Sequence, residues 1–174
     1  MKFSPQDKIF AHLAIQEAEK TLRHGNYPIG SVLVVNGKAV AKSSNRLRAH
    51  QNWASHAEMQ LLLAHSREIR NAWLAKKKIT LYTTLEPCLM CLGAASLHRV
   101  NRIVFSCPDP RGGATMLNPK PLTEFYREHW PKIDGGIFRE EVYEMVMSWI
   151  QKQKTDRWRK NRKLFEHMHA QWTK

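Results

Sequence analysis

The chain has 174 residues, of which 43% are hydrophobic, and this is enough for one domain with a buried core. It contains no run of about eighteen apolar residues and no signal-peptide pattern at its N-terminus, so we expect neither a membrane protein nor a secreted one. Its three cysteines are an odd number, which fits a disulfide framework poorly. We therefore expect a cytoplasmic protein with reduced thiols.

The net charge of +13 is large and unevenly distributed. Residues 151–174 hold eight lysines and arginines against two acidic residues, which gives this segment a net charge of +6. The other 150 residues carry the remaining +7. A basic balance of this kind indicates a polyanionic partner, most often a nucleic acid, although a solvated tail would carry the same charge.

The first half of the chain predicts a helix, a β-hairpin and a second helix. Apolar residues recur at helical spacing near the N-terminus. Two runs rich in β-branched residues then flank Asn36-Gly37, which predicts a hairpin with a type I′ turn. Helix-forming residues follow over 55–74, where Ser55 and Glu58 have the spacing of a capping box.

The second half alternates strands with helices around a Pro/Gly-rich loop, residues 108–121. The predicted elements are a buried strand at 78–84, a helix at 88–98, a strand at 102–107, a short helix at 122–130, a weak strand at 132–138 and a long helix from Arg139 to about Lys163. This alternation after a hairpin predicts an α/β fold, a three-layer α/β/α sandwich around one mixed five-stranded sheet. The helices that start near residues 56 and 88 each follow a segment leaving the sheet, where open α/β sheets bind ligands.

The residue types at these two helix starts are those of a metal site. Cys88 and Cys91 lie at i and i+3 directly after Pro87, and a helix N-terminus favours the thiolate that binds metal. His56 stands at the other helix start and can supply a third ligand. Glu58, two residues further on, projects to another side of the same turn. It is therefore placed to reach a water on the metal rather than the metal itself.

The number of ligands decides between a catalytic and a structural zinc site. Three protein ligands and a water are typical of catalysis, whereas four protein ligands are typical of structure. The candidates for a fourth ligand are His50, His65, His98 and Cys107, and none belongs to a second CxxC or a histidine pair. A redox CxxC would leave the His-Ala-Glu triplet without a role. The pattern H-x-E followed by P-C-x-x-C is the signature of zinc-dependent nucleobase deaminases, and each half alone is weak. We predict one Zn²⁺ per chain, with Glu58 as the carboxylate that moves protons.

These motifs resemble those of the cytidine/deoxycytidylate deaminase superfamily, most closely the bacterial tRNA adenosine deaminases. The resemblance runs from the first helix to about residue 154. It is carried by YPIGSVLVVNGKAVAKSSN (27–45), SHAEMQLL (55–62), LYTTLEPCLMCLGA (81–94) and HRVNRIVFSCPDPRGG (98–113). It implies the fold already predicted, a homodimer with sites near the subunit interface, and a deaminase domain over residues 1–154 followed by a basic helical extension over 155–174.

The resemblance also implies roles for individual residues. His56, Cys88 and Cys91 would ligate zinc, and Glu58 would carry protons to the ring nitrogen and the leaving amine. Asn45 would hydrogen-bond the purine. The remaining substrate contacts would come from the backbone around Ala57 and Pro87-Cys88, at the attacked carbon and its amino group, and from Asp109 and Arg111, at the flanking nucleotides.

Two departures from the family pattern concern the substrate. Trp53 stands just before the His-Ala-Glu triplet, where it would either stack on a base or narrow the entrance. Residues 155–174 extend beyond a compact family member, and Arg157-Trp158-Arg159 suits either RNA or the end of a packed amphipathic helix.

The motifs therefore predict a zinc-dependent hydrolytic deaminase, and the resemblance implies that it converts adenosine to inosine in the anticodon of a tRNA, at the wobble position. The alternative substrate is a free nucleobase or nucleoside, such as guanine, adenine or cytosine, which would leave the positive charge without a function. A third alternative is a zinc-stabilised RNA-binding protein without catalysis. Glu58 argues against it, because a structural zinc site needs no additional carboxylate.

Overall fold

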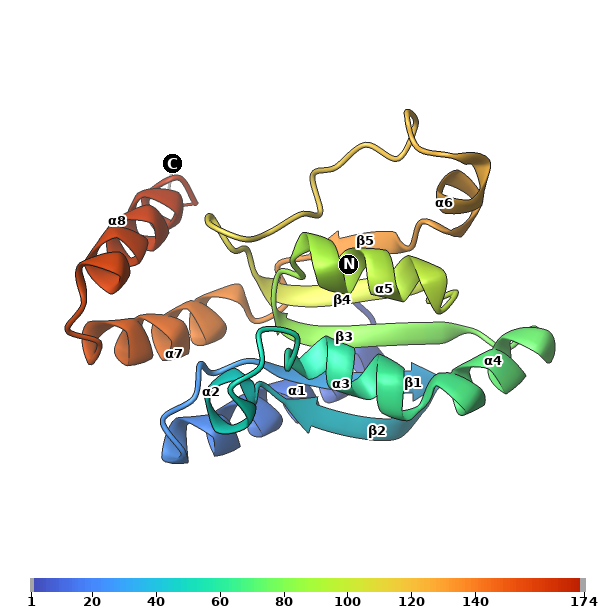
Figure 1. Ribbon diagram of the computed structural model, residues 1–174, viewed down its shortest axis with the longest axis horizontal. Coiled ribbons are helices and arrows are strands. Elements are labelled where there is room, and N and C mark those ends of the chain that lie inside the picture. Colours follow the sequence, from blue (N-terminus) through green and yellow to red (C-terminus); the bar gives the residue numbers. More distant parts are fainter. Residues whose placement is uncertain (1, 173–174) are drawn as a thin grey trace.

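A five-stranded sheet forms the centre of the molecule in a computed structural model that describes residues 2–172 (Figure 1). Its strands are β1 (Gly30–Val35), β2 (Lys38–Ser44), β3 (Ile79–Leu85), β4 (Arg102–Cys107) and β5 (Lys132–Gly135). They are arranged in the order β2-β1-β3-β4-β5. β1 pairs antiparallel with β2 and β3, whereas β3–β4 and β4–β5 are parallel. The mixed five-stranded sheet that the sequence predicted is thus confirmed.

Helices cover both faces of this sheet (Figure 1). They are α1 (Pro5–Arg23), α2 (Leu47–His50), α3 (Ala57–Ala64), α4 (Ser66–Leu74), α5 (Leu89–Leu97), α6 (Glu124–His129), α7 (Arg139–Gln151) and α8 (Asp156–Ala170). α1 lies on one face of the sheet, and α3 and α5 lie on the other. The short helix α2 follows β2 and was not predicted from the sequence.

Alternate residues of the strands fill the two core layers, because successive side chains of a strand point to opposite faces. Val32 of β1 packs with Phe10 and Ala14 of α1. Its neighbour Leu33 packs on the opposite face with Leu61 of α3 and Leu92 of α5. The sandwich is therefore held by apolar contacts on both sides of the sheet.

The β1–β2 hairpin has the turn that the sequence predicted. Asn36 and Gly37 have φ angles of 49° and 78°. A type I′ turn needs positive φ at both central residues, and Asn and Gly reach this region most easily. β1 and β2 are therefore joined by the tightest connection available to twisted antiparallel strands.

The predicted helix over 55–74 is two helices, and its predicted capping box is wrong. The chain breaks at His65, which has φ −110° and ψ 19° and separates α3 from α4. The N-cap of α3 is His56, without a side-chain hydrogen bond, and Ser55 instead contacts His50. Glu58 cannot return to the cap because its carboxylate accepts a hydrogen bond from Thr83 of β3.

The predicted long helix from Arg139 to Lys163 is also wrong. α7 ends at Gln151, and α8 begins at Asp156 after a short turn. The break lets α8 fold back so that Phe165 is fully buried in one cluster with Val146 of α7. The apolar burial of Phe165 explains why a basic segment forms a packed helix. Residues 173 and 174 of the predicted extension lie outside the described residues.

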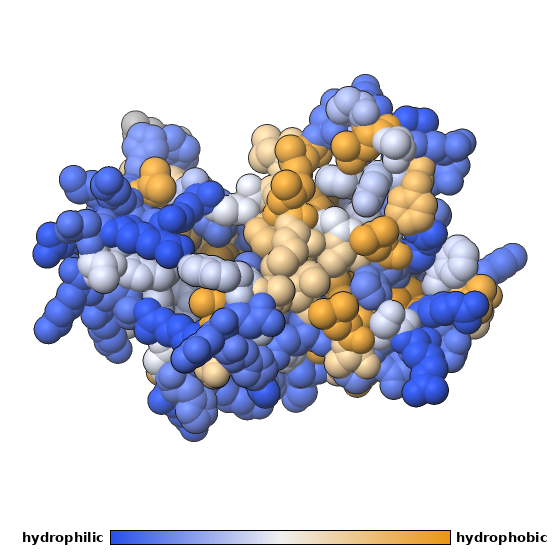
Figure 2. All heavy atoms as spheres, viewed as in Figure 1, coloured by the Kyte–Doolittle hydropathy of each residue, from blue (hydrophilic) through white to orange (hydrophobic). Residues whose placement is uncertain are grey.

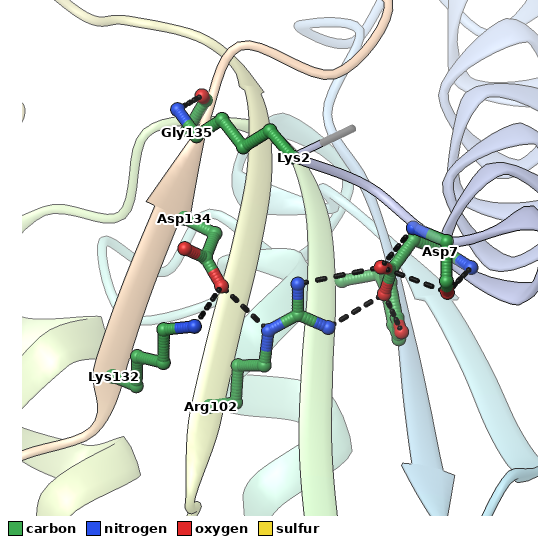
Figure 3. Close-up of polar contacts among 8 residues, drawn as sticks. Lys2, Asp7, Arg102, Lys132, Asp134 and Gly135 are labelled. Atoms are coloured by element: carbon green, nitrogen blue, oxygen red, sulfur yellow. Dashed lines mark hydrogen bonds and ion pairs between the residues drawn. The ribbon is translucent and has the colours of Figure 1, made fainter.

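An ionic network ties α1 to the sheet (Figure 3). Arg102 of β4 donates to Asp7 of α1 and to Asp134 of β5, each at 2.6 Å. Tyr82 of β3 also donates to Asp7, at 2.7 Å. Burial alone would raise the pKa of Asp7, but the hydrogen bonds from Arg102, Tyr82 and Ser4 outweigh it and hold this pKa well below its usual range.

Candidate active site

Two helix starts bring the predicted metal ligands together. His56 is the N-cap of α3 and Cys88 is the N-cap of α5, and both have extended backbone conformations. Cys91 lies in the first turn of α5, so it reaches the same place as Cys88. β3 leads directly into this region through Pro87. The fold thus joins two motifs about thirty residues apart in the sequence.

The three ligand atoms have the spacing that zinc needs. Cys88 Sγ lies 3.6 Å from His56 Nδ1 and 3.6 Å from Cys91 Sγ, and Cys91 Sγ lies 3.5 Å from His56 Nδ1. Tetrahedral zinc with Zn–S of about 2.3 Å and Zn–N of about 2.0 Å separates its ligands by roughly 3.5 to 3.8 Å. Among the described residues, this is the one group of three or more potential ligands that converges in this way. The donor set and its spacing therefore fit zinc.

The thiol and imidazole groups influence one another strongly. The hydrogen bond between Cys88 and Cys91 lowers the pKa of Cys88 to about 4, against the effect of burial, and His56 lowers it further. The hydrogen bond to Cys88 raises the pKa of His56. The cluster thus favours the thiolate at Cys88, the form of cysteine that binds a metal, whereas the hydrogen bond to Cys88 and burial raise the pKa of Cys91.

Glu58 lies beside the three ligand atoms and is not one of them. Its residue is 3% exposed, and its carboxylate accepts from Thr83 Oγ1 at 3.1 Å and contacts Cys91 Sγ at 3.6 Å. Burial raises the pKa of this carboxyl. A carboxyl in such a place can hold and release a proton next to the metal position.

A pocket of about 460 Å³ opens in front of this cluster. It is lined by His56, Glu58 and Cys88 together with the predicted contacts Asn45, Asp109 and Arg111. Trp53, 73% exposed, lies at the same pocket. Ala57 and Pro87 are buried and do not line it with their side chains. The fold thus brings together the distant segments that the sequence selected, while the contacts of Ala57 and Pro87 with a substrate stay a prediction.

The side chain of Asn45 has one paired and one unpaired polar group. Its Oδ1 accepts from the Leu47 backbone N–H at 3.2 Å, and its Nδ2 has no hydrogen-bond partner within residues 2–172. The residue is buried apart from the pocket that it lines. The NH₂ group is therefore free to donate to a bound molecule.

Glu86 is a site residue that the sequence analysis missed. One of its oxygens accepts from the backbone N–H and the hydroxyl of Thr115, and the other accepts from the backbone N–H of Asp109. These bonds hold the loop after β4 against the start of α5. Arg111 lies in this loop and donates to the side chain of Asn161. A carboxylate just before Pro87 has no local pattern that would have identified this function.

The aromatic and C-terminal walls of the pocket were also missed. Tyr27, Trp149 and Trp158 pack together, with ring centroids 4.6 to 5.5 Å apart. α8 adds Arg157, Asn161 and Phe165 to the lining. The Arg-Trp-Arg stretch was one available signal, and packing in the helix was one of its two interpretations.

Residues 4–107 match the family described as the cytidine and deoxycytidylate deaminase zinc-binding region, and this range includes His56, Cys88 and Cys91. The fold and the three-ligand site are those of a zinc deaminase. The chain belongs to the cytidine and deoxycytidylate deaminase family, which confirms the family resemblance and the zinc cofactor predicted from the sequence.

Two individual relatives are similar to most of the chain. The chain is 37% identical over 145 residues to the tRNA-specific adenosine deaminase of Bacillus subtilis, covering 83% of this chain and 89% of that protein. It is 31% identical over 147 residues to the tRNA-specific adenosine deaminase of Agrobacterium fabrum, covering 84% and 95%.

Two solved structures have the same fold as this chain. A structure from work on A-to-I editing by tRNA:A34 deaminases matches with 33% identity and a TM-score of 0.63, over 79% of this chain and 98% of that chain. The guanine deaminase of Nitrosomonas europaea shares the fold at 14% identity, with a TM-score of 0.62 over 84% of each chain. The predicted fold class is therefore confirmed. Among the described helices, none has both the length and the apolar character required to cross a bilayer.

Proposed function

We propose that this chain deaminates adenosine to inosine in tRNA, at the wobble position of the anticodon. The observation that carries the proposal is the convergence of Arg48, Arg111 and Arg157, from three different segments, on the pocket that holds the metal ligands. Cationic groups at this position provide affinity for the phosphates of an RNA strand. The similarity to two tRNA-specific adenosine deaminases over more than four fifths of the chain supports the same substrate.

The reaction is a hydrolysis in which a C–O bond forms at the purine C6 and the C6–N bond breaks, releasing ammonia. When held by His56, Cys88 and Cys91, zinc supplies the Lewis acid that activates water at neutral pH. Glu58 takes the proton that water loses and delivers protons to the ring nitrogen and the leaving amine. Thr83 keeps the carboxylate in place through its hydrogen bond to Oε1.

The other predicted residues bind and orient the nucleotide. The free NH₂ group of Asn45 donates to the purine, and the backbone at Ala57 and Pro87-Cys88 contacts the reacting carbon and its amino group. Asp109 and Arg111 contact the flanking nucleotides. Support comes from Asn45, Asp109 and Arg111, which line one pocket although they come from distant parts of the chain.

A second candidate function is deamination of a free nucleobase or nucleoside. One observation favours it: α8 closes one side of the pocket with Trp158 and Phe165, which leaves a volume of about 460 Å³ for a ligand. A pocket of this size suits a single base or nucleoside. The arginines at the same pocket favour a polyanionic substrate.

The same proposal includes a homodimer formed through the outer face of α3 and α5. Hydrophobic side chains gather over these helices at the centre of the face shown in Figure 2. The exposed residues Leu63, Leu89, Met90 and Leu97 belong to them. A contiguous apolar patch of this kind marks an interaction surface. Leu89 and Met90 directly follow Cys88, so the partner subunit would lie close to the active site. A cytoplasmic location, where tRNA is found and thiols remain reduced, completes the proposal.

An ammonia-release assay that compares a tRNA pool with free bases and nucleosides tests the substrate. We expect release from tRNA, and turnover of guanine or cytosine with none on tRNA would overturn the proposal. Glu58→Ala should keep one zinc per chain and lose activity by about 100-fold or more, which is the usual contribution of a positioned acid–base group. Glu144→Ala is the matched control, because Glu144 is exposed on α7.

A further inference from the structure

Helix α8 forms one wall of the active-site pocket with a single stripe of side chains. Arg157, Asn161 and Phe165 follow one another at intervals of four residues, so they lie on the same face of the helix. All three line the pocket that also contains His56 and Glu58. In Figure 1 this helix turns back beside the end of the sheet from which α5 begins. The C-terminal helix is therefore part of the binding site.

Asn161 is the polar member of this stripe and is almost completely buried, with 5% of its surface exposed. Its Oδ1 accepts a hydrogen bond from Arg111 Nη1. A guanidinium group has donors and no acceptor, so the oxygen of the carboxamide must face Arg111 and the NH₂ group must face away. The hydrogen bond from Arg111 thus determines which end of the carboxamide faces the guanidinium group.

The NH₂ group of Asn161 has no hydrogen-bond partner among residues 2–172. The described side-chain atoms that are fully buried without a partner are Asn26 Oδ1 and Arg99 Nη1, so this NH₂ group is accessible rather than enclosed in the core. The Asn161 side chain lines the pocket, and a bound molecule with an acceptor atom can pair with it. Asn45 also lines this pocket, and its carboxamide NH₂ group likewise has no hydrogen-bond partner among residues 2–172.

The position of the Asn161 carboxamide depends on Arg111 and on the loop that carries it. Arg111 is fixed by the loop that Glu86 binds, and its own backbone N–H donates to Asp109 at 3.0 Å. Trp158, three residues before Asn161 in α8, packs edge-on against Trp149, with ring centroids 4.6 Å apart, and this contact fixes the start of the helix. A side chain that is already oriented before the ligand binds loses little conformational entropy on binding. Its NH₂ group therefore favours ligands that place an acceptor atom at this position.

We propose that Asn161 is a specificity-determining residue whose Nδ2 group donates a hydrogen bond to an acceptor atom of the nucleotide in the pocket, while Arg111 orients its carboxamide. The inference rests on the proposed function in one respect, that the ligand is a nucleotide or nucleoside. It assigns to α8 a direct part in substrate recognition.

The variant Asn161→Asp distinguishes a role of Asn161 in ligand binding from a role in the packing of α8. Aspartate has the same shape and still accepts from Arg111, so the packing of α8 is preserved, but the donor to the ligand is lost. Binding of tRNA and of adenosine is measured by titration in the zinc-loaded Glu58→Ala background, so that the result does not depend on turnover. We expect Asn161→Asp and Asn161→Ala each to weaken binding about tenfold, the usual effect of one hydrogen bond. We also expect the melting temperature of the Asp variant to stay unchanged.

Gln171→Glu is the control for charge, since it makes the same charge change at the exposed C-cap of α8. Repeating the titration at high salt removes long-range repulsion, and the loss at Asn161 should persist. Binding by Asn161→Asp equal to that of the parent would overturn the inference and indicate a structural role alone. The proposed function is judged separately, by ammonia release from the wild-type enzyme.

Discussion

Glu86 and Thr115 are joined by two hydrogen bonds, from the backbone N–H at 3.0 Å and from the hydroxyl at 2.6 Å, both to the same carboxylate oxygen. The other oxygen accepts from Asp109 N–H at 3.0 Å. A side chain at Gly113 would collide with this carboxylate and come within 2.7 Å of the Asp109 carbonyl oxygen. Glu86 therefore positions the loop that carries Asp109 and Arg111, although it takes no part in the chemistry.

Replacing Glu86 should displace this loop without removing the metal. Hydrogen bonds to a charged group each contribute about 1.5–3 kcal/mol, so we expect Glu86→Ala to lower stability by about 2–3 kcal/mol. Its activity should fall at least tenfold while the zinc content stays at one per chain. Metal analysis, thermal unfolding and ammonia release measure these effects. Glu124→Ala, at an exposed position in α6, is the control. Normal activity in Glu86→Ala would show that the loop is positioned by other contacts.

The third cysteine provides a direct test of the ligand set. Cys88→Ala removes one of the three ligand atoms that lie within 4.8 Å of one another, so zinc should fall from about one per chain to well below half. Cys107→Ala should retain its zinc, because Cys107 lies at the end of β4 outside this group. Bound metal stabilises the folded state by mass action, and a chelator should lower the melting temperature of Cys107→Ala but not that of Cys88→Ala. Loss of zinc from both variants would mean that Cys107 is also a ligand.

At Gly30 the backbone of β1 packs closely against the backbone of α1. A Cβ atom there would collide with the Ala14 carbonyl oxygen and lie 2.5 Å from Ala18 N. Because both atoms are backbone, relief requires α1 to shift, and Gly30→Ala should cost at least about 1–3 kcal/mol. Thermal unfolding measures this as a drop of about 2–4 °C per kcal/mol for a chain of this size.

Gly93→Ala is the matched change in α5. A Cβ atom at Gly93 meets nothing within 4 Å. Gly93 lies between Leu89 and Leu97 on the proposed dimer face, so the comparison is made at a protein concentration at which the chain is monomeric. Alanine is favoured over glycine inside a helix by about 0.5–1 kcal/mol, so this variant should then be as stable as the parent or slightly more stable. Equal melting temperatures for the two alanine variants would contradict the close packing at Gly30.

The features that the sequence predicted correctly are those with a local signal. Asn36-Gly37 defines its turn through backbone preferences alone, and the fold confirms it. The convergence of His56, Cys88 and Cys91 could be predicted because each occupies a helix start that is visible in the sequence, and their role as zinc ligands stays a prediction. Strands β1, β3 and β4 carry apolar residues on both faces of the sheet, so helices are expected to cover both faces.

The features that the sequence did not predict depend on contacts between distant residues. The helix break after Gln151 has no strong local signal, and its cause is the burial of Phe165 against the rest of the C-terminal cluster. The orientation of Asn161 depends on Arg111, fifty residues away. Glu86 acts through a loop whose path cannot be derived from its proline and glycine content. Long-range packing therefore determines which side chains form the walls of the pocket, whereas local motifs place the candidate metal ligands His56, Cys88 and Cys91.

The pairing of Asp7 with Arg102 predicts how stability depends on pH. The folded-state pKa of Asp7 lies below the unfolded value of about 3.9, so folding is favoured by the ionised carboxylate. This contribution is fully present above about pH 5 and is lost as the pH falls below about 4 towards the folded-state pKa. Urea unfolding at a series of pH values should show the decline in the wild type. Asp7→Asn should be less stable at neutral pH by about 1.5–3 kcal/mol, because Arg102 loses one of its two carboxylate partners and keeps Asp134. Its stability should fall less steeply in acid, and an identical acid profile in the two proteins would contradict the assignment to Asp7.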